Sequence, residues 1–182
     1  MKSNRIISLA VSALTLTGIF FTAAVHAQTS KTTMLAESKD AKAAFMKVDK
    51  SMENLFSNSY GYVIFPNIGK GAFIVGGAGG KGTVFEKGKA IGKAKMVQVT
   101  AGLQAGGQAY REVIFFENKD ALDRFKNDKL EFSGQVSAVA AKEGASANAK
   151  YTDGVAVFTQ ERGGLMLEAS LGGQKLTYKP FN

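Results

Sequence analysis

The sequence predicts an α+β domain in which a strongly curved or barrel-like antiparallel sheet of about eight strands is joined by an N-terminal amphipathic helix and a short second helix. Two hydrophobic periods support this class. Near the N-terminus apolar residues recur with the 3.6-residue period of a helix, and beyond Tyr60 they alternate with the two-residue period of a strand. Short connections that contain glycine indicate hairpins, and glycines inside strands permit the tight coiling of a curved sheet.

The N-terminus has the layout of a secretory signal peptide. Two basic residues precede an apolar stretch (residues 6–21), and Val25-His26-Ala27 places small residues at the −3 and −1 positions of a cleavage site. An uncleaved membrane anchor is the alternative. We expect secretion across the inner membrane and a periplasmic protein that associates with the membrane. The chain then has three parts, a signal peptide at residues 1–27, a flexible N-terminus at 28–33 and a single domain at 34–182.

The composition restricts the chemistry of the mature chain. The sequence has no cysteine, and its only histidine, His26, would leave with the signal peptide. A histidine-activated nucleophile is therefore excluded, as are zinc or copper sites built on imidazole or thiolate. No nucleophile-elbow motif or acidic metal loop is visible. We expect a protein that is not an enzyme and that uses no cofactor or metal.

The mature chain would be basic. The whole sequence has 23 basic and 15 acidic residues, and removal of Lys2 and Arg5 leaves 21 basic residues and a net charge of +6. A basic secreted domain favours an anionic partner such as lipid headgroups or acidic glycans, although a charge of this size also serves solubility. Because we expect the protein to be secreted, we do not expect nucleic acid as a partner.

An amphipathic helix is predicted over about residues 33–57, because an apolar stripe runs at helical spacing from Met34 to Phe56. Asn58, Ser59 and Gly61 end it. Packing of this stripe in the core is the expected use of the helix. Two apolar residues lie off the stripe, which suggests membrane contact as a second use. The candidates for that contact are Leu35, Lys39, Lys42, Met46 and Lys50.

The remaining elements follow in order from alternation and turn residues. A second helix is predicted over residues 119–126, with Asn118 as its N-cap. Small residues at 144–149 predict a loop. Strands are predicted over residues 60–65, 71–76, 83–86, 96–110 with a break at Gly106-Gly107, 111–116, 135–141, 155–160, 165–171 and 175–178.

The stretch GGAGGKG contains a G-x-G-x-x-G pattern, which raises the question of a phosphate-binding loop. Such a loop lies between a strand and the N-terminus of a helix, and an acidic residue follows about 20 residues later. Here the residues after Gly82 predict a strand, and residues 88–110 contain no acid. We therefore predict that the glycines let neighbouring strands approach closely. These structural glycines are Gly76, Gly77, Gly79, Gly80 and Gly82.

Lysines are concentrated beside these glycines. Five of them lie in the fifteen residues from Lys81 to Lys95, and Glu86 is the one acid among them. A solvated basic hairpin with no ligand is one interpretation, and contact with anionic headgroups is the other. The candidate headgroup-binding residues are Lys70, Lys81, Lys87, Lys89, Lys93 and Lys95.

Three separated blocks of sequence resemble the SYLF domain family. They are YGYVIFP with KGAFIVGG and GKG (within residues 60–82), AGLQAGGQ (101–108) and a last block at 163–173, in the family's order. The likeness runs from about residue 36 to residue 178. It implies a lipid-binding module, since eukaryotic members recognise phosphoinositides, partly through an amphipathic N-terminal helix, and some yeast relatives bind actin. A lone domain behind a signal peptide is similar to the bacterial secreted members.

The sequence departs from the family pattern at two places. The segment around Lys95 lacks the tryptophan and proline of eukaryotic relatives, and residues 144–149 do not reproduce their Gly-Pro-rich turn. In a periplasm we expect neither actin nor phosphoinositides as partners. Two hypotheses follow: a peripheral module that binds an anionic phospholipid membrane surface, or a structural or interaction protein of the envelope that binds acidic glycan or another protein. Both leave the oligomeric state open.

Overall fold

The computed structural model describes residues 30–70, 77–99, 109–130, 138–161 and 174–181 of the 182-residue chain. The chain divides into two compact units, Met1–Ala36 and Glu37–Asn182. In the first unit, residues 30–36 are helical. The second unit contains a helix at residues 37–48 and all the elements that follow.

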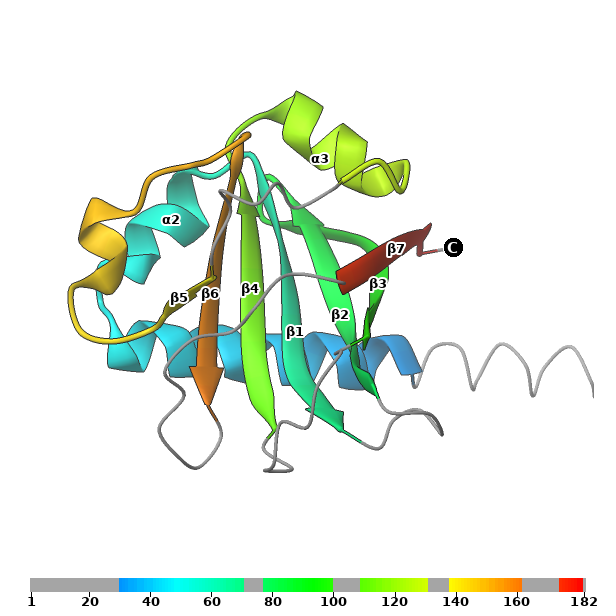
Figure 1. Cartoon of the computed structure of the whole chain (residues 1–182), viewed down its shortest axis with the longest axis horizontal. Coiled ribbons are helices and arrows are strands. Elements are labelled where there is room, and N and C mark those ends of the chain that lie inside the picture. Colours follow the sequence, from blue (N-terminus) through cyan, green and yellow to red (C-terminus); the bar gives the residue numbers. More distant parts are fainter. Residues whose placement is uncertain (1–29, 71–76, 100–108, 131–137, 162–173, 182) are drawn as a thin grey trace, which may run out of the picture. The chain divides into compact units, whose positions relative to one another are not determined.

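Seven strands in the described residues form one sheet in the order β5-β6-β4-β1-β2-β3-β7 (Figure 1). Neighbouring strands are antiparallel, except that β5 pairs with β6 in parallel. The strands are β1 (Gly61–Lys70), β2 (Gly77–Glu86), β3 (Lys89–Val99), β4 (Tyr110–Phe116), β5 (Ala138–Ala140), β6 (Val155–Glu161) and β7 (Gln174–Pro180).

The predicted α+β class is therefore confirmed, and the description of the sheet needs correction. The sheet is open and mixed and has seven strands in the described residues, whereas we predicted a strongly curved or barrel-like antiparallel sheet of about eight strands. The parallel pair arises because β5 and β6 are joined by a long connection that contains η1 (Ala145–Asn148), rather than by a hairpin. Three predicted strand segments, at residues 71–76, 100–108 and 165–171, lie outside the described residues.

The sheet is strongly curved. The amide Nε2 of Gln174 on β7 donates to Oε2 of Glu112 on β4 over 3.1 Å, although β1, β2 and β3 lie between these two strands in the sheet. Four strand spacings in a flat sheet would separate β4 from β7 by roughly 19 Å, which two side chains cannot bridge. The sheet must therefore bend so that one face is concave, and Gln174 and Glu112 meet on that face.

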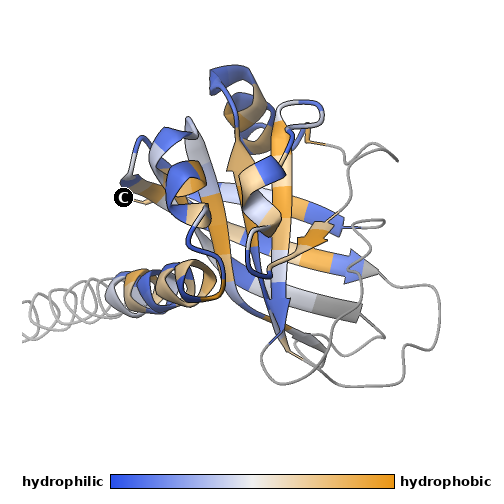
Figure 2. Cartoon of the chain, turned by 90° about the vertical axis from the view of Figure 1, so that its left-hand side faces the viewer, coloured by the Kyte–Doolittle hydropathy of each residue, from blue (hydrophilic) through white to orange (hydrophobic). Residues whose placement is uncertain are grey.

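Helices cover both faces of the sheet. The concave face packs against α3 (Lys119–Lys126), whose Leu122 and Phe125 join Val63, Ile114 and Met96 in one buried cluster. The opposite face packs against residues 37–48 and α2 (Met52–Asn58), which contribute Phe45 and Phe56 to a second cluster. Figure 2 shows the hydrophobic residues gathered on the strands between these helices.

The predicted N-terminal helix is interrupted, which corrects the single helix expected over residues 33–57. Helical structure ends at residue 48, and α2 begins at Met52. The cause is the buried carboxylate of Asp49, which accepts hydrogen bonds from the backbone N–H of Ser51 (3.0 Å) and of Ser146 (2.7 Å). An aspartate that binds nearby backbone N–H groups competes with the helix for them, and the chain turns here.

Local sequence signals explain the other elements. Asn118 caps α3 as predicted, since its Oδ1 accepts from the backbone N–H of Ala121 over 3.0 Å. The first strand was predicted to end at residue 65, but β1 continues past Pro66 through a register shift between Ile64 and Asn67. A bulge accommodates proline because the ladder hydrogen bond is already lost there.

Candidate functional site

A cluster of exposed lysines lies on the convex face of β2, β3 and β7. Strand register and alternation set this arrangement, because residues directly opposite each other share a face. Lys95 lies opposite Lys81 on one side, and Lys93 lies opposite Lys179 on the other. Five exposed lysines share the face, and we call them the lysine face: Lys81, Lys93, Lys95, Lys175 and Lys179.

Thr83 places the helix of residues 37–48 beside this face. Thr83 lies opposite Lys93 in the register and is fully buried, and the hydroxyl of Ser38 donates to its Oγ1 over 2.8 Å. The helix therefore meets the sheet next to the lysine face. Its own charges near this contact are mixed, since Lys39 and Asp40 are both exposed.

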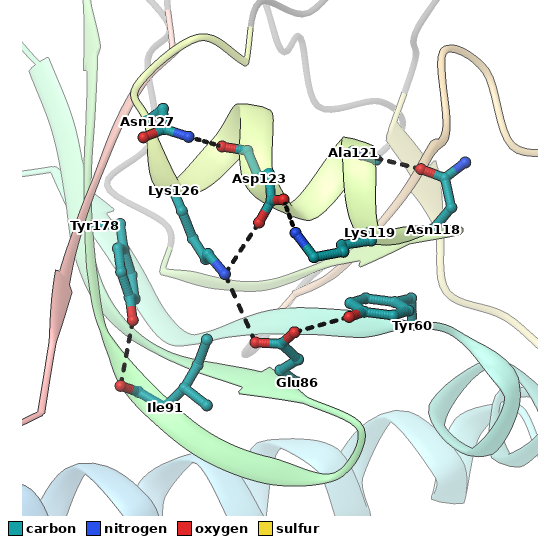
Figure 3. Close-up of polar contacts among 10 residues, drawn as sticks. All are labelled: Tyr60, Glu86, Ile91, Asn118, Lys119, Ala121, Asp123, Lys126, Asn127 and Tyr178. Carbon is teal, nitrogen blue, oxygen red and sulfur yellow. Dashed lines mark hydrogen bonds and ion pairs between the residues drawn. The ribbon is translucent and has the colours of Figure 1, made fainter.

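Glu86, the only acid on β2, β3 and β7, is turned away from the lysine face. Figure 3 shows its carboxylate on the α3 side, between Tyr60 and Lys126. The hydroxyl of Tyr60 donates to Glu86 Oε1 over 3.0 Å, and Lys126 Nζ lies 3.7 Å from Glu86 Oε2. Lys126 is held in turn by Asp123 at 3.1 Å. Glu86 therefore balances a positive charge of α3, and it contributes no negative charge to the convex face.

The six lysines predicted to bind headgroups do not all lie on one surface. Lys81, Lys93 and Lys95 belong to the lysine face. Lys87 lies in the two-residue β2–β3 turn, where its amino group is 5.2 Å from the centre of the Tyr60 ring. Lys89 pairs with Glu86 in the register and so lies on the α3 side. Lys70 ends β1, and its side chain lies outside the described part.

Sequence reasoning missed Lys175 and Lys179. These two residues complete the lysine face from a strand that is about eighty residues further along the chain. The available signal was the alternation of Lys175, Thr177 and Lys179 with Leu176 and Tyr178, which marks one polar face. What the sequence did not reveal was the pairing of β7 with β3, which is a long-range contact.

The candidate membrane-contact residues of the N-terminal helix are also separated. Met46 is half-buried and packs against the cluster of the convex face. The Lys42 amino group lies 4.7 Å from the centre of the Phe56 ring, and burial lowers the pKa of Lys42 although Glu53 opposes part of that shift. Both side chains therefore serve the core.

The other three candidates are placed differently. Lys39 and Lys50 are exposed, Lys50 in the turn before α2. Leu35 is helical and half-buried, and it lies in the first unit of the chain.

The glycines of the G-x-G-x-x-G pattern lie in β2, which runs on as a strand to Glu86. An added Cβ at Gly80 would lie 2.7 Å from the carbonyl oxygen of Asn67, and one at Gly82 would lie 2.6 Å from that of Ile64. Neither residue has the left-handed backbone that favours glycine. Close approach of β1 is therefore what requires glycine at these two positions. Gly77 and Gly79 lie in the same strand, and Gly76 lies outside the described residues.

The described residues contain neither a metal-binding group of side chains nor a membrane-spanning helix. No group of three or more histidine, cysteine, aspartate or glutamate side chains is placed to hold a metal ion in those residues. No helix in the same part of the chain combines the length and the apolar character needed to cross a bilayer.

The fold and the lysine face define a small α+β domain with a basic convex surface. Residues 97–180 match the model of the Ysc84 family, which is described as "Las17-binding protein actin regulator". The chain is also 31% identical over 156 residues to beta cell expansion factor A of Aeromonas veronii, an alignment that covers 83% of this chain and 59% of that protein. The resemblance to the SYLF domain family is therefore confirmed, since the Ysc84 model represents this domain and matches residues 97–180.

Proposed function

We propose that the protein is a non-enzymatic peripheral module of the cell envelope that binds the surface of an anionic phospholipid membrane through its lysine face. The observation that carries this proposal is the pairing of like charges across strands. Lys81 lies directly opposite Lys95, and Lys93 directly opposite Lys179. Like charges at such positions destabilise a sheet, and an anion that lies over Lys93 and Lys179 removes the repulsion within that pair.

Protection of a sheet edge does not account for the whole face. Lysines on an edge strand discourage strand addition by other chains, which explains Lys175 and Lys179 if β7 is an edge. Lys81, Lys93 and Lys95 lie on β2 and β3, which are paired on both sides and need no such protection. Their exposure on one face favours an external anionic surface as the partner.

The expected strength of binding follows from the number of lysines. Each lysine near an anionic membrane contributes about 1 kcal/mol, so five on one face contribute up to about 5 kcal/mol. Loss of one lysine would change binding only about fivefold, which is hard to interpret. The informative variant therefore replaces all five residues of the lysine face by glutamine.

We expect this five-lysine variant to lose on the order of a hundredfold or more in partitioning onto vesicles that contain anionic phospholipid. Co-sedimentation of the processed chain with anionic and with zwitterionic vesicles measures this. Binding of the unchanged protein should also weaken steeply with salt, as the Debye length falls from about 10 Å at 0.1 M to about 3 Å at 1 M.

A control variant with the same change in charge separates a specific face from total charge. It replaces five exposed lysines outside the lysine face by glutamine: Lys87, Lys89, Lys129, Lys142 and Lys150. We expect it to retain most of the binding and both variants to stay folded, since exposed charges contribute little to stability. Equal losses in the two variants would mean that net charge alone drives binding. No binding to either kind of vesicle would favour the alternative, an interaction protein of the envelope.

A proposal on location accompanies this function. Since Val25-His26-Ala27 has the pattern of a cleavage site, we expect the N-terminus of the exported protein to be Gln28. N-terminal sequencing of the protein from a periplasmic extract measures this. Recovery of the chain with Met1 in the membrane fraction would instead show an anchored protein.

A further inference from the structure

The concave face of the sheet carries buried polar side chains at the end remote from α3. Glu112 on β4 is fully buried, and Gln98 on β3 is 6% exposed. Gln174 Nε2 donates to Glu112 Oε2 over 3.1 Å, and the Tyr110 hydroxyl donates to Gln98 Oε1 over 3.1 Å. Both hydrogen bonds cross the interior of the curved sheet, since they join β4 to strands that are not its neighbours.

Two oxygen atoms in this cluster lack a partner. Glu112 Oε1 and Gln174 Oε1 are both buried, and neither has a hydrogen-bond partner in the described structure. If the carboxyl group is ionised, both atoms are acceptors and cannot satisfy each other. A buried ionised carboxylate with an unpaired oxygen is also strongly unfavourable. A proton on Glu112 Oε1 removes the buried charge and supplies a donor where both oxygen atoms lack one, while Gln174 Nε2 still donates to Glu112 Oε2.

The surroundings of Glu112 agree with a neutral acid. Burial raises the pKa of Glu112 from 4.5 to about 8, although the hydrogen bond from Gln174 opposes part of that shift. Burial also raises the pKa of Tyr110, followed by the effect of Glu112, so the phenol stays neutral.

The polar and titratable groups that face Glu112 come from several strands. Thr159 lies opposite Glu112 on β6, and Glu161, opposite Tyr110, has one buried oxygen without a partner in the described part. Tyr110, Gln98 and Gln174 complete the set. Lys70 ends β1 near this end of the sheet, with its side chain outside the described residues.

We propose that Glu112 and Gln174 form a neutral acid–amide pair that fastens β7 to β4 through the interior of the curved sheet, and that loss of the Glu112 proton releases β7. Release of β7 would also affect the lysine face, which lies on the opposite side of this strand. Lys175 follows Gln174 directly and belongs to the lysine face, as does Lys179. The protonation state of one buried carboxyl group thus controls whether β7 keeps these lysines beside those of β3.

The direction of the pH dependence follows from the raised pKa. The folded protein holds the Glu112 proton more tightly than the unfolded chain does, so the stabilisation is complete below pH 4.5. It is lost progressively as the pH rises to about 8. Within this interval the equilibrium constant for unfolding should increase up to about tenfold for each pH unit.

The test replaces Glu112 by glutamine, whose amide has the donor and acceptor pattern of the neutral acid and does not titrate. Urea unfolding of the purified protein is measured at pH 5, 7 and 9. We expect Glu112→Gln to match the unchanged protein at pH 5 and to unfold with an equilibrium constant at least about a hundredfold smaller at pH 9. The control, Glu117→Gln, removes an exposed acid next to β4 and should keep the original pH dependence. The proposal is overturned if Glu112→Gln shows the same pH dependence of unfolding as the unchanged protein.

A second measurement addresses β7 itself. Amide hydrogen exchange in the β3–β7 ladder, relative to the β1–β2 ladder, should accelerate between pH 7 and pH 9 in the unchanged protein and not in Glu112→Gln. Equal acceleration in both proteins would show that β7 is not released by Glu112. Calcium chloride supplies a further check at pH 7. A saturable rise in melting temperature that Glu112→Gln abolishes would identify Glu112 as a cation ligand and overturn the acid–amide pair.

One arm of the test rests on the proposed membrane binding. Binding to anionic vesicles should weaken above pH 8 in the unchanged protein and stay constant in Glu112→Gln. The unfolding and exchange measurements need no lipid. If the unfolding and exchange results are as expected but neither protein binds vesicles, the membrane function is rejected and the acid–amide pair stands. If both proteins bind vesicles with the same pH dependence, control of the lysine face by Glu112 is rejected.

Discussion

Replacing Gly82 by valine should lower the free energy of unfolding by about 3 kcal/mol, because β1 leaves no room for a side chain there. An added Cβ would lie 2.6 Å from the carbonyl oxygen of Ile64 and 2.8 Å from Cδ1 of Phe65. Neither neighbour yields easily, since Ile64 contributes backbone and Phe65 is fully buried. Real Cβ atoms do not come this close, so the two strands must separate. Thermal unfolding should show a fall in Tm of roughly 10 °C.

Gly69→Val is the matched control for this prediction. Gly69 lies in β1, the strand that pairs with β2, and among the described residues an added Cβ there would meet only Ala109 Cβ, at an ordinary distance of 4.0 Å. We expect a change within about 0.5 kcal/mol, as at other sites where a side chain fits. Equal losses at Gly82 and Gly69 would show that valine disturbs this part of the sheet generally, and that the close approach at Gly82 is not the cause. Saturable stabilisation of the unchanged protein by ATP or NAD would revive the phosphate-loop interpretation.

Local chemistry in the sequence was sufficient to predict many elements of the fold. The side chain of Asn118, followed by an amphipathic turn, predicted α3 correctly at both ends. The residues after Gly82 predicted the continuation of β2, because β-branched and aromatic residues favour a strand over a helix. Each of these signals acts over a few neighbouring residues, so long-range contacts in the fold do not change the element that it predicts.

Elements decided by distant partners were not predicted. The break after residue 48 depends on Ser146, which lies 97 residues from Asp49 in the sequence and donates its backbone N–H to that carboxylate. Periodicity alone therefore predicted one continuous helix and missed the break. The direction of β5 depends in the same way on its pairing with β6, and its short apolar run carries no information on orientation.

In the candidate site, too, the sequence predicted the local features and missed those that depend on distant strands. The sequence located the lysine-rich segment, and alternation would assign its lysines to two sides of a strand. Only the register revealed that Lys89 turns to α3 with Glu86, while Lys93 lies beside Lys179 of β7. Glu112 carried no sequence signal of its own, because its burial results from the curvature that brings Gln174 across the sheet.

Replacing Asp49 by alanine should also lower the free energy of unfolding by about 3 kcal/mol, since it leaves two backbone N–H groups without an acceptor. The carboxylate accepts from Ser51 and Ser146, and it joins the turn between the N-terminal helix and α2 to the 3₁₀ helix η1. Asp40→Ala is the control, because Asp40 is exposed on the same helix. We expect that change to cost less than about 0.5 kcal/mol.

The pH dependence of this loss identifies the carboxylate charge as its cause. Burial raises the pKa of Asp49, but the hydrogen bonds from Ser146 and Ser51 outweigh burial and bring it below 3.8. The folded protein therefore binds this proton more weakly than the unfolded chain does, and the stabilisation is present above pH 3.8 and lost as the pH falls through the folded pKa. Chemical unfolding between pH 6 and pH 2 should show the gap between the unchanged protein and Asp49→Ala closing toward the acid end. A gap that stays constant over this range would mean that alanine acts by leaving a cavity, and that the charge-assisted hydrogen bonds at Asp49 do not hold the two helices at this turn.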